Sequence, residues 1–239
     1  MSALVVLPTF QEAGNVEVAI RAIRAAAPDV HVLVVDDASP DGTAAIAERV
    51  GAEVGQVDIL RRDGKHGLGR AYRAGFGWGM DRGFDVLVSM DADLSHDAAA
   101  LPLLLAASAT ADVVVGSRYV PGGTIPDWSF HRRALSRWGN RYADAVLRLG
   151  VRDATSGFRA YRTEALRHLD LDRLSADGYG FQIEMVYRLV RQGGRAAEVP
   201  IHFVDRRVGK SKMSGRIIVE AFALVTGWAA MDVLHRFRR

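Results

Sequence analysis

Residues 32–43 read Val-Leu-Val-Val-Asp-Asp-Ala-Ser-Pro-Asp-Gly-Thr, and this stretch decides the fold class. It begins with four apolar residues, a run short enough for a buried strand. Ser-Pro-Asp-Gly then supplies a side-chain oxygen cap and a proline near a helix start. A strand followed at once by a turn and a helix is half of a βαβ unit, from which mainly parallel sheets are built.

The same alternation extends in both directions along the first half of the chain. We predict strands at residues 4–7, 32–35, 57–60, 86–90 and 113–115, and helices at 16–27, 43–50, 68–80 and 98–107. After Gly116 the alternation stops, and we predict a basic helix at 132–149, a strand at 157–161, a helix at 181–191, a strand at 197–204 and a terminal helix. The predicted fold is α/β: one domain over residues 1–239, with a Rossmann-like, mainly parallel sheet flanked by helices and with C-terminal elaborations.

Composition excludes several classes of protein. The chain has 239 residues, of which 49% are apolar and 25% charged, as in an ordinary globular protein rather than a disordered or collagenous one. It contains no cysteine, which excludes disulfides and cysteine-based metal sites. Residues 1–120 carry 10 basic and 16 acidic side chains, whereas residues 121–239 carry 21 basic and 12 acidic ones. The two halves therefore differ in charge, −6 against +9, although the whole chain has only +3.

Two apolar stretches bear on membranes. Residues 3–7 are too short an apolar run for a secretory signal peptide, so we expect no export by that route. Residues 217–234 would form a helix of about 27 Å, close to the thickness of a bilayer core. Glu220 and Asp232 interrupt this stretch, and each acid inside a spanning helix would cost about 2.5–3.5 kcal/mol. We therefore predict a terminal helix that is bound at a surface or packed on the core.

Carboxylates follow three of the predicted strands. Glu12 comes after the first strand, Asp36 and Asp37 after the second, and Asp91 and Asp93 after the fourth. Ligands of open parallel sheets bind beyond the carboxyl ends of the strands, where these acids would meet. A hard divalent cation is their natural partner. In the alternative, one of the last two aspartates caps the helix near residue 98 and the other pairs with an arginine. The number of converging acids disfavours this alternative.

Candidate phosphate-binding cations gather from residue 118 onward. Arg118 follows a strand, Arg132 opens the basic helix, and residues 206–212 carry four positive charges. Arginine forks match phosphate oxygens, so this loop predicts a phosphate site, with a solvated basic loop as the alternative. Residues 64–70, Gly-Lys-His-Gly-Leu-Gly-Arg, are consistent with either a phosphate-cradling loop or a simple glycine-rich turn.

The basic helix presents arginines at helical spacing. Arg133, Arg137, Arg141 and Arg148 are predicted to share one face, which Trp128, Phe130 and Trp138 flank. Such a face suits anionic lipid headgroups and equally suits an ordinary exposed helix. We expect no nucleic-acid partner, because no recognised nucleic-acid motif accompanies the basic patch.

Five segments, read in order, resemble a known family along nearly the whole chain. They are residues 7–12 (Leu-Pro-Thr-Phe-Gln-Glu), 34–43 (Val-Val-Asp-Asp-Ala-Ser-Pro-Asp-Gly-Thr), 90–96 (Met-Asp-Ala-Asp-Leu-Ser-His), 116–120 (Gly-Ser-Arg-Tyr-Val) and 206–213 (Arg-Arg-Val-Gly-Lys-Ser-Lys-Met). The chain thus resembles the dolichol (polyprenol) phosphate mannose synthases, which are inverting family 2 glycosyltransferases with the GT-A fold.

The resemblance implies roles for individual residues. It places the nucleotide against Pro8, Phe10, Glu12, Asp36 or Asp37, Asp91 and Ala92. It assigns a Mg²⁺ or Mn²⁺ ion to Asp91 and Asp93, with Ser95 as a further ligand at a position where many members have glutamine. It implies that donor and acceptor phosphates are bound by four cations, Arg118, Arg132, Arg206 and Lys212. These four and the metal ligand Asp93 make up the implied catalytic residues.

The resemblance also implies an activity. It indicates inverting transfer of mannose from GDP-mannose to a polyprenyl monophosphate at the cytoplasmic face of the membrane, by a protein attached peripherally. Residues 1–120 would bind nucleotide and metal, and residues 121–239 would bind the acceptor and face the membrane, with a separate membrane-spanning protein as a candidate partner. Two alternatives stay open: glucosyl transfer from UDP-glucose to the same lipid, and a non-catalytic nucleotide-sugar binding module.

Overall fold

Strands from both halves of the chain form one sheet. The computed structural model describes residues 1–174, 176, 178–205 and 215–237. Within these residues the sheet has seven strands in the order β3-β2-β1-β4-β6-β5-β7. Their bounds are β1 (Ala3–Thr9), β2 (His31–Asp36), β3 (Val57–Arg61), β4 (Val86–Ser89), β5 (Val113–Ser117), β6 (Arg159–Arg162) and β7 (Ala196–Pro200). The sheet is mainly parallel, as predicted.

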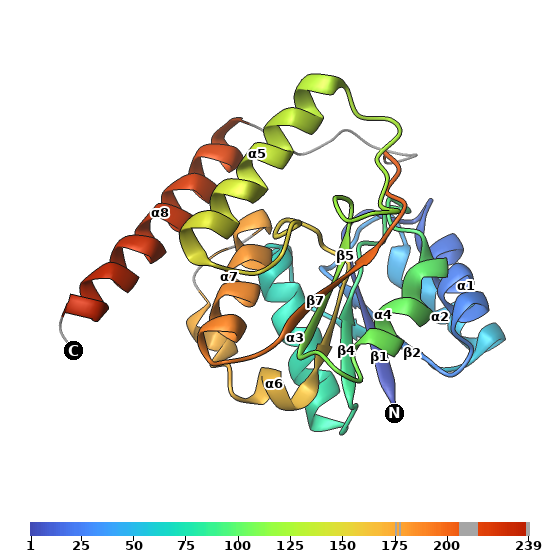
Figure 1. Ribbon diagram of the computed structural model, residues 1–239. Coiled ribbons are helices and arrows are strands. Elements are labelled where there is room, and N and C mark those ends of the chain that lie inside the picture. Colours follow the sequence, from blue (N-terminus) through green and yellow to red (C-terminus); the bar gives the residue numbers. More distant parts are fainter. Residues whose placement is uncertain (175, 177, 206–214, 238–239) are drawn as a thin grey trace.

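Helices cover both faces of this sheet (Figure 1). One face packs against α1 (Val16–Ala26), α2 (Thr43–Val54) and α4 (Leu101–Ala107), which a short 3₁₀ turn, η1 (Ala98–Ala100), precedes. The other packs against α3 (Leu68–Asp81), α6 (Thr163–Arg167) and α7 (Gly178–Arg191), near a second 3₁₀ turn, η2 (Leu171–Arg173). Two longer helices, α5 (Phe130–Leu147) and α8 (Gly215–Phe237), extend this second layer.

The central strands are apolar along their length because both of their faces are buried. In β1, Leu4 and Val6 contribute to the α3 side of the core, whereas Val5 and Leu7 contribute to the α1 side. This division follows from the alternation of side chains along a strand. Continuous apolar runs are typical of parallel strands covered on both faces.

Strand β6 runs against the direction of its neighbours. It lies between β4 and β5 and pairs antiparallel with both. The edge at which β1, β2, β4 and β5 end is therefore the edge at which β6 begins. The residues that precede β6 consequently join those that follow the parallel strands, and this reversal brings residues 153–157 to the functional edge.

Several predicted bounds shift for local reasons. The predicted helix at 98–107 is divided into η1 and α4, and the Asp97 side chain caps η1 by accepting a hydrogen bond from the Ala99 N–H. The basic helix begins at Phe130 rather than Arg132, because Ser129 is its N-cap. The strand predicted at 197–204 ends at Pro200. In the described residues after it, isolated bridges at His202 and Phe203 continue the pairing.

Helices α5 and α8 lie side by side at one end of the molecule (Figure 1). The Phe222 ring of α8 lies 5.0 Å from the rings of Trp138 and Tyr142 of α5. Trp228 stacks on Tyr187 of α7, 5.6 Å away. Helix α8 thus packs on its neighbours through aromatic contacts, and none of the described helices is both long enough and apolar enough to span a membrane.

Candidate active site

A cleft of about 430 Å³ opens where β1, β2 and β4 end. It brings together most of the residues predicted to bind nucleotide or metal. The predicted residues among its lining are Pro8, Phe10, Glu12, Asp37, Asp91, Ala92 and Asp93. The prediction that these segments converge at one edge of the sheet is confirmed.

Asp91 is held from the core side by Tyr72 of α3. The Tyr72 hydroxyl donates a hydrogen bond to Asp91 Oδ1 at 2.9 Å. Burial, and then the charge of Asp91, raise the pKa of Tyr72 well above its ordinary value, so the phenol stays protonated as a donor. On the other carboxylate oxygen, Nε2 of the buried His96 lies 3.8 Å from Oδ2. Asp91 is therefore held by Tyr72, which no predicted motif contains, and lies close to His96, the last residue of the segment 90–96.

Asp93 is oriented by the backbone and hydroxyl of Ser95. Asp93 Oδ1 accepts hydrogen bonds from the Ser95 N–H at 3.1 Å and from Ser95 Oγ at 2.6 Å. The hydroxyl proton of Ser95 thus points at Asp93, and a direct contact of Ser95 with a metal stays a prediction. The alternative that Asp91 or Asp93 caps the following helix is wrong, because Asp97 occupies that position.

The adjacent Asp36 and Asp37 have different surroundings. Asp36 is 2% exposed, and its carboxylate accepts from Thr9 Oγ1 at 3.0 Å and from the Ser39 N–H at 2.9 Å. Asp37 lines the cleft and forms an ion pair with Arg62 at 2.6 Å. Of the two acids that the resemblance left open, Asp37 faces the cleft, while Asp36 braces the loop beneath it.

The turn after β2 also shapes the loop after β1. The Gln11 N–H donates to Ser39 Oγ at 3.0 Å, and the Ala13 N–H donates to Asp41 Oδ2 at 3.1 Å. Burial alone would raise the pKa of Asp41, but hydrogen bonds, first from the Thr43 hydroxyl, outweigh it and lower the pKa. The turn that starts α2 therefore also fixes the β1 loop at the cleft.

Backbone strain gathers in these same loops. Gln11, Ala38 and Leu94 follow β1, β2 and β4, and their φ angles are 59°, 55° and 62°. Non-glycine residues in this left-handed region cost on the order of 1–3 kcal/mol each and persist only where neighbouring contacts enforce them. Their position after three strands is typical of a functional edge.

The glycine-rich segment reaches the cleft as well. Lys65, Gly67 and Leu68 contribute to its lining, and Lys65 Nζ lies 4.2 Å from the centre of the Phe10 ring. A cation is thereby held at the cleft, in the segment that leads into α3. This placement favours the phosphate-cradling interpretation over that of a simple turn.

The carboxylates of Asp91 and Asp93 fit a hard divalent ion. Mg²⁺ is usually bound through one or two carboxylates together with substrate phosphates, not by a cage made only of protein. In the part of the chain that the structure describes, no three His, Cys, Asp or Glu side chains gather to form such a cage. The donor set therefore suits an ion shared with a diphosphate.

A second, smaller cavity of about 110 Å³ lies between α5, α7 and α8. Its lining is mostly apolar and includes Leu135, Ile183, Phe222 and Val225. Two predicted phosphate-binding residues, Arg118 and Arg132, also line it. The two predicted cations are thus placed next to apolar surface, outside the lining of the carboxylate cleft.

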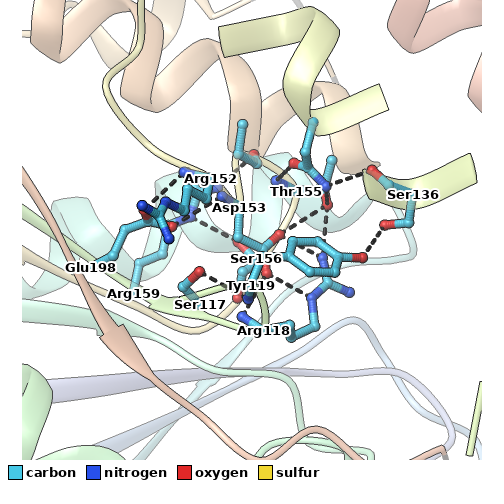
Figure 2. A network of polar contacts seen from close by, with 12 residues as sticks. Ser117, Arg118, Tyr119, Ser136, Arg152, Asp153, Thr155, Ser156, Arg159 and Glu198 are labelled. Atoms are coloured by element: carbon cyan, nitrogen blue, oxygen red, sulfur yellow. Dashed lines mark hydrogen bonds and ion pairs between the residues drawn. The ribbon is translucent and has the colours of Figure 1, made fainter. Parts of the chain in front are cut away.

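Arg118 forms a buried ion pair with Asp153 (Figure 2). Asp153 accepts from the Arg118 N–H at 2.9 Å, from Nε at 2.7 Å and from Nη2 at 2.6 Å. Burial alone would raise the pKa of Asp153, but the charge and hydrogen bonds of Arg118 outweigh it and lower the pKa. The guanidinium is consequently fixed in orientation.

Arg132 is paired differently. Its Nη1 lies 3.1 and 3.2 Å from the two carboxylate oxygens of Asp205, and its guanidinium stacks 3.9 Å from the Trp128 ring centre. The Trp128 indole N–H donates to the same carboxylate at 2.9 Å. The predicted residues Arg206 and Lys212 lie outside the described residues.

The cleft and the apolar cavity adjoin each other. Thr155 and Ala221 line both of them. A site lined by carboxylates and a site lined by arginines and apolar side chains therefore meet at one place.

Comparison with known proteins agrees with this geometry. Residues 4–170 match the family model described as glycosyl transferase family 2. The chain belongs to glycosyl transferase family 2. It is 50% identical over 228 residues to an undecaprenyl-phosphate mannosyltransferase from Micrococcus luteus, covering 95% of this chain and 94% of that protein. It is 46% identical over 237 residues to a polyprenol monophosphomannose synthase from Mycolicibacterium smegmatis, covering 98% and 89%. The predicted resemblance is confirmed.

Solved structures of more distant proteins share the fold. Glucosyl-3-phosphoglycerate synthase from Mycobacterium tuberculosis, in complex with phosphoglyceric acid, has a TM-score of 0.73 at 22% identity, covering 96% of this chain and 80% of that one. A mannosyltransferase from Pyrobaculum calidifontis, in complex with GDP-Man and Mn²⁺, has a TM-score of 0.63 at 18% identity, covering 96% and 64%. The predicted α/β fold of this glycosyltransferase is confirmed.

Sequence reasoning missed several polar residues of this family 2 enzyme. Asp153 and Thr155 lie before β6, Asn140 lies within α5, and Asp205 follows β7. The signal for the first two was Asp-Ala-Thr-Ser-Gly at 153–157, small polar residues just before a predicted strand. In a parallel sheet, ligand-binding residues are expected after the strands. Because β6 is antiparallel, the residues before it lie at that same edge, and the sequence pattern did not predict this.

Proposed function

We propose that this glycosyltransferase transfers mannose from GDP-mannose to a polyprenyl monophosphate with inversion at the anomeric carbon. The observation that carries the proposal is the junction of two different sites at Thr155 and Ala221. One site offers carboxylates for a metal–diphosphate, and the other offers arginines beside apolar surface, as a lipid phosphate requires. The names of the two curated relatives support the same acceptor class.

The donor nucleotide belongs in the carboxylate cleft. Pro8, Phe10, Glu12 and Asp37 surround the base and ribose, and Lys65 neutralises phosphate charge. Asp91 and Asp93 would hold Mg²⁺ or Mn²⁺, and such an ion, when bound, would supply charge stabilisation for the leaving diphosphate.

The acceptor phosphate belongs beside Arg118 and Arg132. A phosphate monoester has its second pKa at about 6, so it is already largely ionised and attacks without a strong general base. The main obstacle is repulsion between two anions, which the arginines offset by holding the acceptor in place.

The outer face of α5 is suited to a membrane surface. Phe130 and Trp138 are 72% and 57% exposed, and they border a shallow groove with Arg133, Arg137 and Arg141. Arg148, predicted on the same face, lies beyond the last turn of α5 with φ of 55°. Arg148 is thus the C-cap residue of α5, and its place on this face stays a prediction. Three arginines and two exposed aromatic rings support peripheral attachment at the cytoplasmic face, where the acceptor lipid would be reached.

A direct transfer assay tests the proposal. Purified protein is incubated with polyprenyl phosphate and labelled GDP-mannose or UDP-glucose, with divalent metal or with chelator, and the lipid is extracted. We expect label from GDP-mannose in the presence of metal. Label from UDP-glucose alone would overturn the donor assignment, and unlabelled lipid under every condition would overturn the proposed reaction.

A further inference from the structure

Thr155 stands at the junction of the two cavities. Among the described residues that line both, Ala221 has no polar side-chain atom, so Thr155 supplies the polar group at the junction. Its hydroxyl is part of the network in Figure 2, which links the loop after β5, the segment before β6 and helix α5. No predicted motif contains this residue.

The Thr155 hydroxyl contacts Arg118 directly. Arg118 Nη2 donates to Thr155 Oγ1 at 2.8 Å while it also donates to Asp153 at 2.6 Å. The hydroxyl proton is directed to Asp153 Oδ1 at 3.3 Å. A carboxylate alone would fix one edge of the guanidinium, and the added hydroxyl contact restrains its rotation.

The same residue ties α5 to the junction. Asn140 of α5 is 1% exposed, and its Nδ2 donates to Thr155 Oγ1 at 3.2 Å, while its Oδ1 accepts from the Thr155 N–H at 3.2 Å. This two-way contact sets the position of α5, which also carries Arg132. Thr155 therefore contacts Arg118 directly and contacts, through Asn140, the helix that carries Arg132.

We propose that Thr155 is a positioning residue for sugar transfer, which holds Arg118 and helix α5 in register where donor and acceptor meet. The inference rests on the proposed function, because it assigns the acceptor phosphate to the arginine side. A hydroxyl has one donor and two acceptor positions, and Asp153, Arg118 and Asn140 use all three. Valine has nearly the same shape and makes none of these contacts, so Arg118 and Asn140 would each lose an acceptor.

Matched variants test the inference. We expect Thr155→Val to lower kcat by about 10–100-fold, since a misplacement of about 1 Å in a reacting site costs up to 10²-fold. The KM for GDP-mannose should stay within about threefold, because the base and ribose contacts lie on the β1 and β2 loops. Thr155→Ser should restore most of the rate. Thr110→Val, which removes a hydroxyl at an exposed position, serves as the control.

Other readouts separate positioning from folding. GDP binding by calorimetry should be unchanged in Thr155→Val, and thermal unfolding reports its stability. If that variant does not fold, Asn140→Ala removes the contact from the α5 side and should show the same selective loss of kcat. A wild-type rate for Thr155→Val, or equal losses in Thr155→Val and Thr155→Ser, would overturn the positioning role.

The assay uses whichever donor labels the lipid in the wild type. A wild type that uses UDP-glucose alone would overturn the donor assignment and still decide the role of Thr155. A wild type inactive with both donors would overturn the proposed function and this inference together. An active wild type with a Thr155→Val variant of equal rate would overturn this inference alone.

Discussion

At the scale of single residues, the two aspartates after β4 show how a short motif is supported. Asp91 is held by a buried tyrosine, and Asp93 by the residue two positions later. Both carboxylates therefore have fixed orientations before any ligand binds. Preorganised charge of this kind is what makes a site effective, because little reorganisation is needed during the reaction.

Asp93→Asn should abolish most metal-dependent turnover. The amide keeps an oxygen that can accept from Ser95, but it removes the charge that a divalent ion needs. A loss of several kcal/mol in transition-state stabilisation corresponds to a fall in kcat of at least about 10²-fold. The measurement is lipid mannosylation over a titration of Mg²⁺ and Mn²⁺.

The control for this change is Asp97→Asn, the same substitution four residues later. Asn is as good an N-cap as Asp, so this variant should retain activity and stability. Near-normal, metal-stimulated activity of Asp93→Asn would remove Asp93 from the proposed metal site.

Asp153→Asn should destabilise the fold more than an ordinary surface substitution. Removing one member of a buried ion pair leaves the other charge uncompensated, at a cost of about 3–5 kcal/mol. For a chain of this length each kcal/mol corresponds to about 2–4 °C in Tm. Asp170→Asn, at an exposed ion pair with Arg173, should change stability by about 0.5 kcal/mol or less.

The ion pair between Arg118 and Asp153 should also make the free energy of unfolding depend on pH. The pKa of Asp153 is lower in the folded than in the unfolded protein, so between the two values only the unfolded state binds the proton. Its stabilising contribution is therefore complete above about pH 4, the unfolded pKa, and declines as pH falls toward the folded value. In urea unfolding across acid pH, the free energy of unfolding should change less steeply with pH in Asp153→Asn than in the wild type. Identical slopes would contradict a lowered pKa of Asp153 in the folded protein.

At the scale of elements, helix α3 approaches the sheet through glycine. A Cβ on Gly75 would overlap Val6 Cγ1 and come within 3.2 Å of Val35 Cγ2, whereas a Cβ on Gly77 would meet nothing within 4 Å. The close approach also places Tyr72, one turn earlier, beneath Asp91. The packing distance of α3 thus contributes directly to the geometry of the cleft.

Alanine substitutions in α3 should therefore have opposite effects. Gly75→Ala should destabilise the protein by about 1–3 kcal/mol, because a branched strand residue cannot move aside easily. Gly77→Ala should stabilise it by up to about 1 kcal/mol through helix propensity. Chemical denaturation of both variants checks this, and equal effects would show that helix propensity, rather than close packing, dominates at Gly75.

The elements differ in how well sequence predicts them. Strands β1, β2 and β4 and the acids that follow them are predictable, because burial on both faces leaves a continuous apolar run and an abrupt polar end. The direction of β6 is not, because it depends on pairing with β4 and β5, which are distant in sequence. That reversal explains why Asp91 was identified and Thr155 was not.

At the scale of the whole molecule, the contrast between −6 and +9 has a spatial counterpart. The acids that line the cleft come mainly from the first half, with Glu220 of α8 as an exception. Of the arginines of the second half, Arg132 lines the apolar cavity, and Arg133, Arg137 and Arg141 lie on α5. Arg118, which lines the same cavity, belongs to the first half. The halves are nevertheless joined in one sheet, because β6 of the second half lies between β4 and β5 of the first.

The outer face of α5 gives the prediction that belongs to this scale. Replacing Arg133, Arg137 and Arg141 together with glutamine should weaken binding to vesicles that contain phosphatidylserine. Each arginine near an anionic surface contributes about 1 kcal/mol, so the three account for up to about 10²-fold in partitioning. Vesicle sedimentation at low and high salt measures the effect, and high salt should reduce the difference between wild type and variant.

A charge-matched control distinguishes a docking face from net charge. Replacing Arg21, Arg49 and Arg61 with glutamine changes the total charge equally, but these arginines pair with Glu17, Glu48 and Glu53. They lie on or beside α1 and α2, at the opposite end of the molecule from α5 (Figure 1). If α5 is the docking face, this control binds vesicles nearly as well as the wild type. Equal losses in both triple variants would instead assign vesicle binding to overall charge, and the α5 face would then have no special role.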